Sequence, residues 1–355
     1  MVNSSVIKQE ISAVDLFCGV GGLTHGLVSG GVNVVAGIDV DSTCKFPYEA
    51  NNSAHFIEQD VATLEADKVN KLYKKNTIKL LTGCAPCQPF SSYSQSGRNR
   101  DYDSQWPLVL SFGRLIKEIQ PELVAMENVP QLLGHDVFNE FVESLDGYEI
   151  WWSVIDCSLI GVPQTRKRLV LLASLLGEQN LSIDLKQTKV STVMDTIGEL
   201  PPINAGQTHP EDSLHMSPKL GELNMQRIKA SKPGGTWREW PSSLLAECHK
   251  KSSGSTYSSV YGRMEWNKAS PTITTQCFGY GNGRFGHPEQ DRAISLREAA
   301  MLQTFPKNYI FSEPNEKVRF NRMGRLIGNA VPVKLGEVIA NTLSTHVRKS
   351  LLSKE

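Results

Sequence analysis

The chain has 355 residues, of which 40% are hydrophobic and 21% are charged, and its formal net charge at pH 7 is zero. This length accommodates an enzyme core together with a second, smaller unit. The sequence has no apolar run long enough to span a membrane, no secretory signal pattern, and seven scattered cysteines without disulfide-framework spacing, which excludes an integral membrane protein and favours a reducing cytoplasm.

The charges are distributed unevenly along the chain. Residues 227–325 contain 16 Lys/Arg and 8 Asp/Glu, so the remainder of the chain is acidic. A basic region of this kind is typical of proteins that bind a polyanion. The alternative is ordinary solvated surface charge with an accidental asymmetry.

The N-terminal segment has the pattern of a nucleotide-type α/β fold. A short apolar strand at 11–17 is followed by a glycine-rich turn at 18–22 and a helix-like run at 23–28. Small residues in such a turn let a ligand approach the backbone closely. A tight turn without a ligand is the alternative, and the sequence lacks the P-loop motif of kinases and ATPases.

Carboxylates follow the next two predicted strands. The strand at 32–38 ends at Asp39, and the strand at 55–57 leads to Asp60. A carboxylate about 20 residues beyond the glycines can accept hydrogen bonds from ribose hydroxyls. The pattern predicts a nucleotide-like ligand without saying which one.

Two further strands deliver a candidate nucleophile and a candidate acid. The strand at 79–83 leads to Cys87, and after a polar loop and a helix at 108–119 the strand at 121–126 ends at Glu127. A cysteine thiolate is a nucleophile near neutral pH, and a neighbouring carboxyl group can exchange a proton with the reacting molecule.

Cys84 and Cys87 also form a Cys-x-x-Cys pair, which raises metal and redox alternatives. We expect no metal, because no second ligand pair with zinc spacing occurs in the sequence. A thioredoxin-like site is also disfavoured, because the pair precedes a polar loop instead of opening a helix. The remaining cysteines are interpreted as small core or surface residues.

Arg166 and Arg168 precede a predicted strand at 169–173. In an extended segment they would share one face, and paired guanidinium groups suit phosphate or carbonyl oxygens. Surface charge is the alternative interpretation.

The C-terminal part contains two predicted helices. Ser295 and Glu298 form a capping-box pattern at the start of a helix over 295–305. The apolar face of 333–347 predicts a helix that packs against the layer of the first strand. Between 181 and 290 the chain is richer in Ser, Gly, Pro and Lys, with a strand-like piece at 271–275.

Taken in order, these motifs resemble those of the DNA cytosine-5 methyltransferases of the compact bacterial type. The matching blocks are Asp15-Leu16-Phe17-Cys18-Gly19-Val20-Gly21-Gly22, Asp39, Pro86-Cys87-Gln88, Glu127-Asn128-Val129, Gln164-x-Arg166-x-Arg168, Arg297-Glu298-Ala299-Ala300-x-Leu302-Gln303-x-Phe305-Pro306 and Ile327-Gly328-Asn329-Ala330-Val331-Pro332. The resemblance implies an α/β fold with a class I (Rossmann-like) methyltransferase sheet and a smaller target-recognition domain. The implied boundaries are 1–180 with 325–355 for the catalytic domain, 181–290 for the recognition domain and 291–324 for a connecting hinge.

The resemblance also implies the cofactor and the site. S-adenosyl-L-methionine would be the methyl donor and S-adenosyl-L-homocysteine the product. The implied cofactor residues are Phe17, Gly19, Gly21, Gly22, Asp39, Val40, Asp60, Val61, Pro86, Leu108, Asn329 and Val331.

For catalysis, Cys87 would add to C6 of a flipped-out cytosine and Glu127 would bind or protonate N3. Arg166 and Arg168 would hold the base and nearby backbone, with Gln88 and Ser91 beside the thiol. Arginine and asparagine side chains in the variable region could read base edges or contact the DNA; the candidates are Arg238, Arg263, Asn282 and Arg284.

The expected partner is double-stranded DNA, with a cognate restriction endonuclease as a further partner, and we expect a cytoplasmic, nucleoid-associated monomer. A tRNA cytosine methyltransferase would use the same site, but those relatives typically carry Cys-Phe-Thr in the recognition region, where this chain has Cys277-Phe278-Gly279. A catalytically idle DNA-binding regulator is the other alternative, and the intact Cys87 and Glu127 argue against it.

Overall fold

The chain folds into two compact units. In a computed structural model, the structure describes residues 10–86, 107–177, 181–185, 190–251, 254 and 256–352. The first unit contains the chain up to 156, residues 167–186 and the chain from 331 onward, and the second contains 157–166 and 187–330. Cys87, Gln88 and Ser91 lie outside the described residues.

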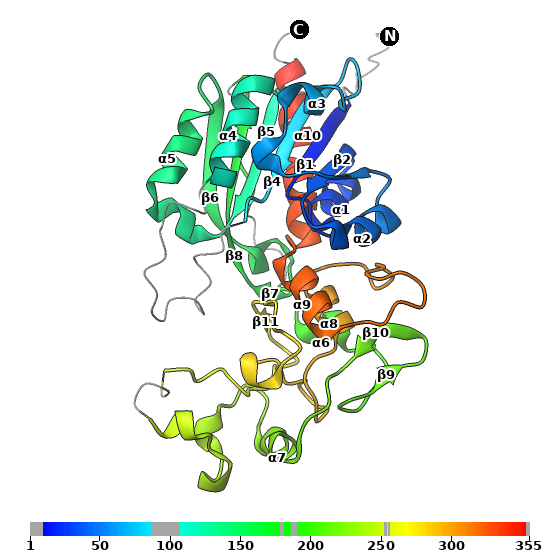
Figure 1. The fold of residues 1–355 in the computed structure, drawn as a ribbon. Coiled ribbons are helices and arrows are strands. Elements are labelled where there is room, and N and C mark those ends of the chain that lie inside the picture. The colour runs from blue at the N-terminus through cyan, green and yellow to red at the C-terminus, as the bar shows by residue number, and fades with distance from the viewer. Residues whose placement is uncertain are drawn as a thin grey trace, which may run out of the picture. The chain divides into compact units, whose positions relative to one another are not determined.

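The first unit is built on a seven-stranded sheet (Figure 1). Its order is β3 (His55–Glu58), β2 (Asn33–Asp39), β1 (Ile11–Leu16), β4 (Ile78–Gly83), β5 (Leu123–Asn128), β8 (Lys167–Ser174) and β6 (Glu149–Asp156). The first five are parallel, β8 is antiparallel to β5, and β6 is antiparallel to β8. Strand order reverses between β1 and β4, and ligands of open α/β sheets bind beyond the carboxyl ends of the strands at such a point. The predicted α/β fold class is confirmed.

Helices cover both faces of this sheet. They are α1 (Gly22–Ser29), α2 (Lys45–Asn51), α3 (Ala66–Asn70), α4 (Pro107–Ile119), α5 (Asp136–Glu143) and α10 (Val333–Leu352). On one face, Val14 and Leu16 of β1 share a buried apolar cluster with side chains of α3, α4 and α5. Alternate residues of a strand point to opposite faces, so Asp15 points to the other face.

The C-terminal helix predicted to pack on the layer of the first strand is present as α10, and it packs against α1, the helix that follows β1 (Figure 1). The approach is close: a Cβ added to Gly26 would lie 2.1 Å from the Val333 carbonyl oxygen and 2.7 Å from the Gly336 Cα. Farther along α10, His346 Nε2 lies 2.7 Å from Ser174 Oγ of β8. The C-terminal helix is therefore part of the first unit.

The second unit has few regular elements. They are β7 (Gln164–Thr165), α6 (Val193–Ile197), β9 (Thr208–His209), β10 (Asp212–Met216), α7 (Glu222–Ala230), β11 (Ser270–Pro271), α8 (Leu296–Leu302) and α9 (Phe320–Asn329). The strand-like piece at 271–275 pairs only at Ser270–Pro271, parallel to β7.

We expected 291–324 to be a hinge, but these residues fold with the second unit. The physical reason is α8, which packs against β10 and α9. Its predicted capping box is present: Ser295 Oγ accepts a hydrogen bond from the Glu298 N–H at 3.1 Å, and Glu298 Oε2 accepts one from the Ser295 N–H at 2.6 Å.

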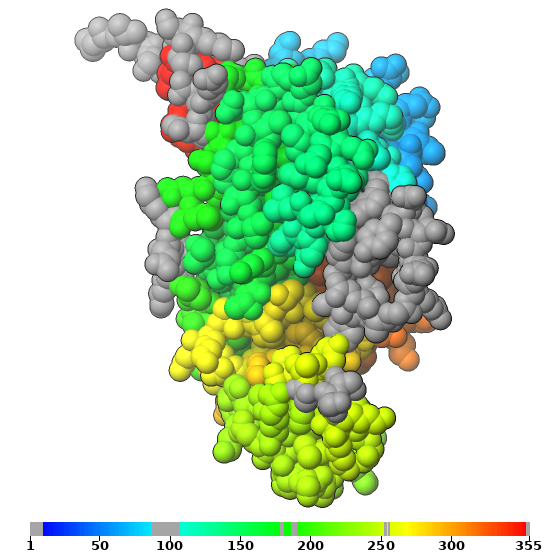
Figure 2. All heavy atoms as spheres, turned by 90° about the vertical axis from the view of Figure 1, so that its left-hand side faces the viewer, coloured from blue at the N-terminus to red at the C-terminus, as the bar shows by residue number. Residues whose placement is uncertain are grey.

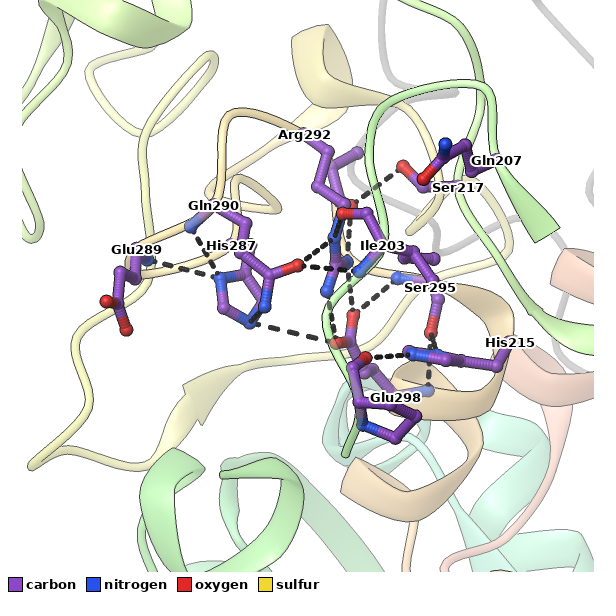
Figure 3. Close-up of polar contacts among 12 residues, drawn as sticks. Ile203, Gln207, His215, Ser217, His287, Glu289, Gln290, Arg292, Ser295 and Glu298 are labelled. Carbon is purple, nitrogen blue, oxygen red and sulfur yellow. Dashed lines mark hydrogen bonds and ion pairs between the residues drawn. The ribbon is translucent and has the colours of Figure 1, made fainter. Parts of the chain in front are cut away.

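A buried polar cluster lies at the start of α8 in the second unit (Figure 3). Arg292 and Glu298 are both almost fully buried and form a bidentate ion pair with two 2.7 Å contacts. His287 lies 3.7 Å from the same carboxylate, and His215 bridges Ser295 Oγ and the Pro201 carbonyl oxygen. Burial raises the pKa of Glu298, but the hydrogen bonds and charge of Arg292 outweigh it and lower the pKa to about 2.

Within the described parts of the chain, no helix has the length and apolar character required to cross a membrane.

Candidate active site

The glycine turn connects β1 to α1 at the carboxyl end of the sheet. Phe17, Gly19 and Gly21 have positive φ values of 57°, 51° and 88°, and Gly22 begins α1. A Cβ added to Gly19 would meet nothing within 4 Å, so the backbone is open on that side. The Gly19 N–H donates to Asp39 Oδ2 at 2.9 Å, which ties the turn to the end of β2.

Asp39 and Asp60 lie at the ends of neighbouring strands. Asp39 is the last residue of β2, and Asp60 follows β3. Burial raises the pKa of Asp39 and outweighs the hydrogen bonds from Asp41 and Gly19 that lower it. Val40 beside it is 68% exposed. Asp60 is exposed and accepts a hydrogen bond from the Ala62 N–H at 2.9 Å, while Val61 is buried. The turn and these carboxylates form an edge suited to a polar ligand.

Asp15 is a buried carboxyl group for which its motif implies no individual role. It lies on β1, and its Oδ2 accepts a 2.6 Å hydrogen bond from Thr24, whose hydroxyl is 3.0 Å from the Tyr48 hydroxyl. Burial raises the pKa of Asp15 from 3.8 to about 7. A carboxyl pKa raised in this way cannot be read from the motif, because it depends on burial beneath α1 and α2, which supply Thr24 and Tyr48.

Glu127 lies at the carboxyl end of β5 and is 2% exposed. Its Oε1 is 2.7 Å from Arg168 Nε of β8, and its Oε2 accepts a hydrogen bond from the Cys84 thiol at 2.6 Å. The Asn128 side chain donates to the Ala85 carbonyl oxygen at 3.2 Å. The carboxylate is therefore held beside the end of β4, from which the chain continues to Cys87.

Pro86 is exposed at the last described position before that gap, and Leu108 lies half-buried in the first turn of α4. Asn329 ends α9 in the second unit and is exposed, whereas Val331 is buried and belongs to the first unit. Asn329 and Val331, two of the predicted cofactor residues, therefore belong to different units.

Arg166 and Arg168 have different partners, in contrast to the expected pair on one face. Arg168 contacts Glu127 and belongs to the first unit. Arg166 is 3% exposed in the second unit and donates to the Ile273 carbonyl oxygen at 2.9 Å and the Gly328 carbonyl oxygen at 3.3 Å. The reason for the difference is that β7 ends at Thr165 and β8 begins at Lys167, so the two arginines do not lie on one continuous strand.

A profile of the C-5 cytosine-specific DNA methylases matches residues 11–345. The chain belongs to this family. It is a DNA cytosine-5 methyltransferase, and the family uses S-adenosylmethionine as methyl donor. Among the described residues of this methylase, no group of three or more His, Cys, Asp or Glu side chains is arranged to hold a metal ion.

Similar proteins support this assignment. The type II methylase M.HgiDII of Herpetosiphon aurantiacus is 51% identical over 339 residues, covering 94% of each chain. The type II methyltransferase M1.HphI of Haemophilus parahaemolyticus is 29% identical over 94% of this chain and 87% of its own length. A DNA modification methyltransferase encoded within an E. coli prophage has the same fold, with a TM-score of 0.74 and 22% identity over 95% of this chain and 99% of its own.

In the second unit, the four predicted DNA-contacting residues have different surroundings. Arg263 is 5% exposed, and its guanidinium group donates to the carbonyl oxygens of Ile228, Ser231, His287 and Gln290 and pairs with Asp291. Arg284 is half-buried and donates to the Gly235 carbonyl oxygen at 2.7 Å. These contacts give both arginines a structural role in the loops they join.

Arg238 is the one exposed residue of these four candidates. Arg238 is exposed, with its guanidinium carbon 5.3 Å from the centre of the Trp237 ring. Trp237 in turn stacks on His249 at 4.1 Å between ring centres. Residues 237–249 follow α7 and precede β11 in the chain, and they belong to the part coloured yellow-green to yellow in Figure 2. Asn282 is half-buried and its amide donates to the Gln276 side chain at 3.3 Å.

Proposed function

We propose that this methylase transfers a methyl group to C5 of a cytosine turned out of duplex DNA, through a covalent bond between Cys87 and C6. The observation that carries the proposal is the position of Glu127: a buried carboxylate with Arg168 on one oxygen, beside the strand end that leads to Cys87. A carboxyl group at this place is suited to contact the same cytosine ring as the thiol that follows β4, at N3 instead of C6.

The chemistry requires these residue types. Cytosine C5 is a poor nucleophile within the aromatic ring, so addition of the Cys87 thiolate to C6 is needed to place electron density on C5. Transfer of a proton from the protonated Glu127 carboxyl group to N3 stabilises the charge that develops in this step. Once C5 carries the methyl group, loss of the C5 proton to a base restores the 5,6 double bond and expels the thiolate, and N3 returns its proton to Glu127.

The target cytosine must first leave the base stack, which costs a few kcal/mol. Gln88 and Ser91, which lie outside the described residues, are proposed to lie beside the thiol. Arg168 is proposed to hold Glu127 instead of the base. The buried contacts of Arg166 support a role in joining the segments around Ile273 and Gly328 within the second unit.

The residues at the glycine turn fit S-adenosylmethionine, the proposed donor, which supplies a methyl group activated on a sulfonium sulfur. The open backbone at Gly19 leaves room for a ligand, and the carboxylates of Asp39 and Asp60 can accept hydrogen bonds from it. Further contacts to the cofactor are proposed from the glycine turn, from residues after β2, β3 and β4, from α4 and from the motif at 327–332. These residues are Phe17, Gly21, Gly22, Val40, Val61, Pro86, Leu108, Asn329 and Val331.

The second unit is proposed to recognise the DNA sequence. The segment 181–290 corresponds to the expected recognition domain, and Arg238 is the preferred candidate for DNA contact because it is exposed in the basic part of the chain. A cognate restriction endonuclease is a further part of the proposal, supported by the type II naming of the relatives. A monomeric state in the bacterial cytoplasm is proposed with it.

The test offers tritiated S-adenosylmethionine with duplex DNA and, separately, with tRNA. We expect label in duplex DNA with the wild-type protein and none with Cys87→Ser. Label in tRNA alone would overturn the choice of substrate, and undiminished transfer by Cys87→Ser would overturn the role of the thiol. Bisulfite sequencing of a genome expressing the chain then reports the target base and its sequence context.

A further inference from the structure

The Cys84 thiol makes a contact with Glu127 for which the proposed reaction has no role. Cys84 Sγ is 2.6 Å from Glu127 Oε2, while Arg168 Nε is 2.7 Å from Glu127 Oε1. The two carboxylate oxygens are thus held by side chains from two different strands. All three residues belong to the first unit, so the arrangement is internal to one compact body.

The backbone fixes this contact. β4 and β5 are parallel neighbours with Gly83 opposite Met126, so Cys84, which follows β4, lies beside Glu127 near the end of β5. The hydrogen bond from the Asn128 side chain to the Ala85 carbonyl oxygen links the end of β5 to the segment that follows β4. The thiol therefore faces the carboxylate because of the strand register.

We propose that Cys84 is a positioning residue that holds the Glu127 carboxyl group in the orientation required to pair with N3 of the target cytosine. This inference rests on the proposed role of Glu127. Arg168 contacts Oε1 and already restrains rotation of the carboxyl group about its Cγ–Cδ bond. A partner on Oε2 adds a second restraint, and an oriented group is what proton transfer in a bound complex requires.

The chemical nature of the partner also matters. A thiol is a weak hydrogen-bond donor, so it can orient Oε2 without competing strongly with the cytosine for that oxygen. A hydroxyl group at the same place keeps a donor, whereas an alkyl group removes it. Position 84 therefore offers a matched set of substitutions that separates hydrogen bonding from packing.

The experiment compares Cys84→Ser, Cys84→Val and Cys84→Ala with the wild-type protein on duplex DNA, with exposed Cys248→Ala as the control for loss of a thiol. For Cys84→Val and Cys84→Ala we expect kcat to fall about three- to ten-fold, the effect of losing one hydrogen bond. KM for DNA and for S-adenosylmethionine should change by less than about two-fold, and Cys84→Ser should recover most of kcat.

A double-mutant cycle with Glu127→Gln separates positioning from packing. If Cys84 acts through Glu127, adding Cys84→Ala to Glu127→Gln produces no further loss of kcat. A full additional loss in the double variant, or equal kcat for Cys84→Val, Cys84→Ser and wild type, would overturn the inference. If Cys84→Ala does not fold, the comparison of Cys84→Ser with Cys84→Val still decides it.

Different results would contradict the proposed role of Glu127 and the positioning role of Cys84. Full activity of Glu127→Gln would overturn the proposed function of Glu127, and the inference about Cys84 with it. An inactive Glu127→Gln together with a normal Cys84→Val would overturn only the positioning role.

Discussion

At the scale of single residues, the chemistry depends on how two carboxyl groups are surrounded. Glu127 is buried but has a cation and a thiol on its two oxygens. Asp15 is equally buried and accepts a hydrogen bond from the Thr24 hydroxyl, but burial outweighs this and raises its pKa to about 7. The same residue class thus has a cationic partner in one place and a hydroxyl partner in the other, which fits the proposed reacting role of Glu127 and a structural role of Asp15.

Replacement of Glu127 tests the first of these environments. We expect Glu127→Gln to lower kcat by about 10²- to 10⁴-fold, because the amide cannot supply the proton to N3. The amide keeps the shape of the side chain, so the affinity for DNA should be retained. Steady-state kinetics and a DNA-binding titration check this, with Glu118→Gln on the exposed face of α4 as the control.

Asp15 predicts a pH dependence of stability. The folded protein keeps the Asp15 proton up to about pH 7, while the unfolded chain releases it near the ordinary pKa of 3.8. The free energy of unfolding should therefore decrease as pH rises from about 4 to 7. In Asp15→Asn, which can still accept from Thr24, this contribution should vanish. Urea unfolding at pH 5 and pH 7 measures it; an identical pH dependence in both proteins would contradict the assignment.

At the scale of elements, the strand ends and the α1–α10 contact determine where the site can form. The sequence alone predicts β1 to β5, β8, α1, α4, α8 and α10, because their apolar runs, caps and strand-end residues are local signals. β6 and α9 were not predicted. The antiparallel return of β8, which brings Arg168 to Glu127, was not predictable either, because it depends on pairing between segments about 40 residues apart.

The α1–α10 contact predicts a steric effect. Gly26→Ala should lower the free energy of unfolding by about 1–3 kcal/mol or more, because the added Cβ would meet the α10 backbone. Gly134→Ala, where a Cβ would meet nothing within 4 Å, should change it by less than about 0.5 kcal/mol. Chemical denaturation of both variants measures the difference, and equal stabilities would contradict the packing described.

The buried ion pair beneath α8 predicts a larger electrostatic effect than an exposed pair. Glu298→Gln leaves Arg292 buried without its charge partner, which costs about 3–5 kcal/mol. Glu247→Gln removes an exposed pair with Lys250 and should cost less than about 1 kcal/mol. Thermal unfolding of the two variants gives the comparison; a Glu298→Gln protein as stable as Glu247→Gln would contradict it.

At the scale of the whole molecule, the family assignment covers nearly the full chain, from 11 to 345. The motifs predicted that the glycine turn, Asp39 and Glu127 lie at strand ends, and the structure has them there, while their roles toward cofactor and base stay predictions. The candidates for DNA contact carry a weaker sequence signal. Arg263 has the sequence character of a base reader, but burial against four carbonyl oxygens gives it a structural role that no local pattern indicates.

The most direct test of the central claim is covalent trapping on duplex DNA that carries 5-fluorocytosine at the target position. The fluorine at C5 prevents the final loss of a proton, so the bond between Cys87 and C6 persists. We predict a protein–DNA adduct that survives denaturing electrophoresis, depends on S-adenosylmethionine and is absent with Cys87→Ser. A wild-type protein that methylates cytosine but forms no adduct, or an adduct of equal yield with Cys87→Ser, would contradict the account.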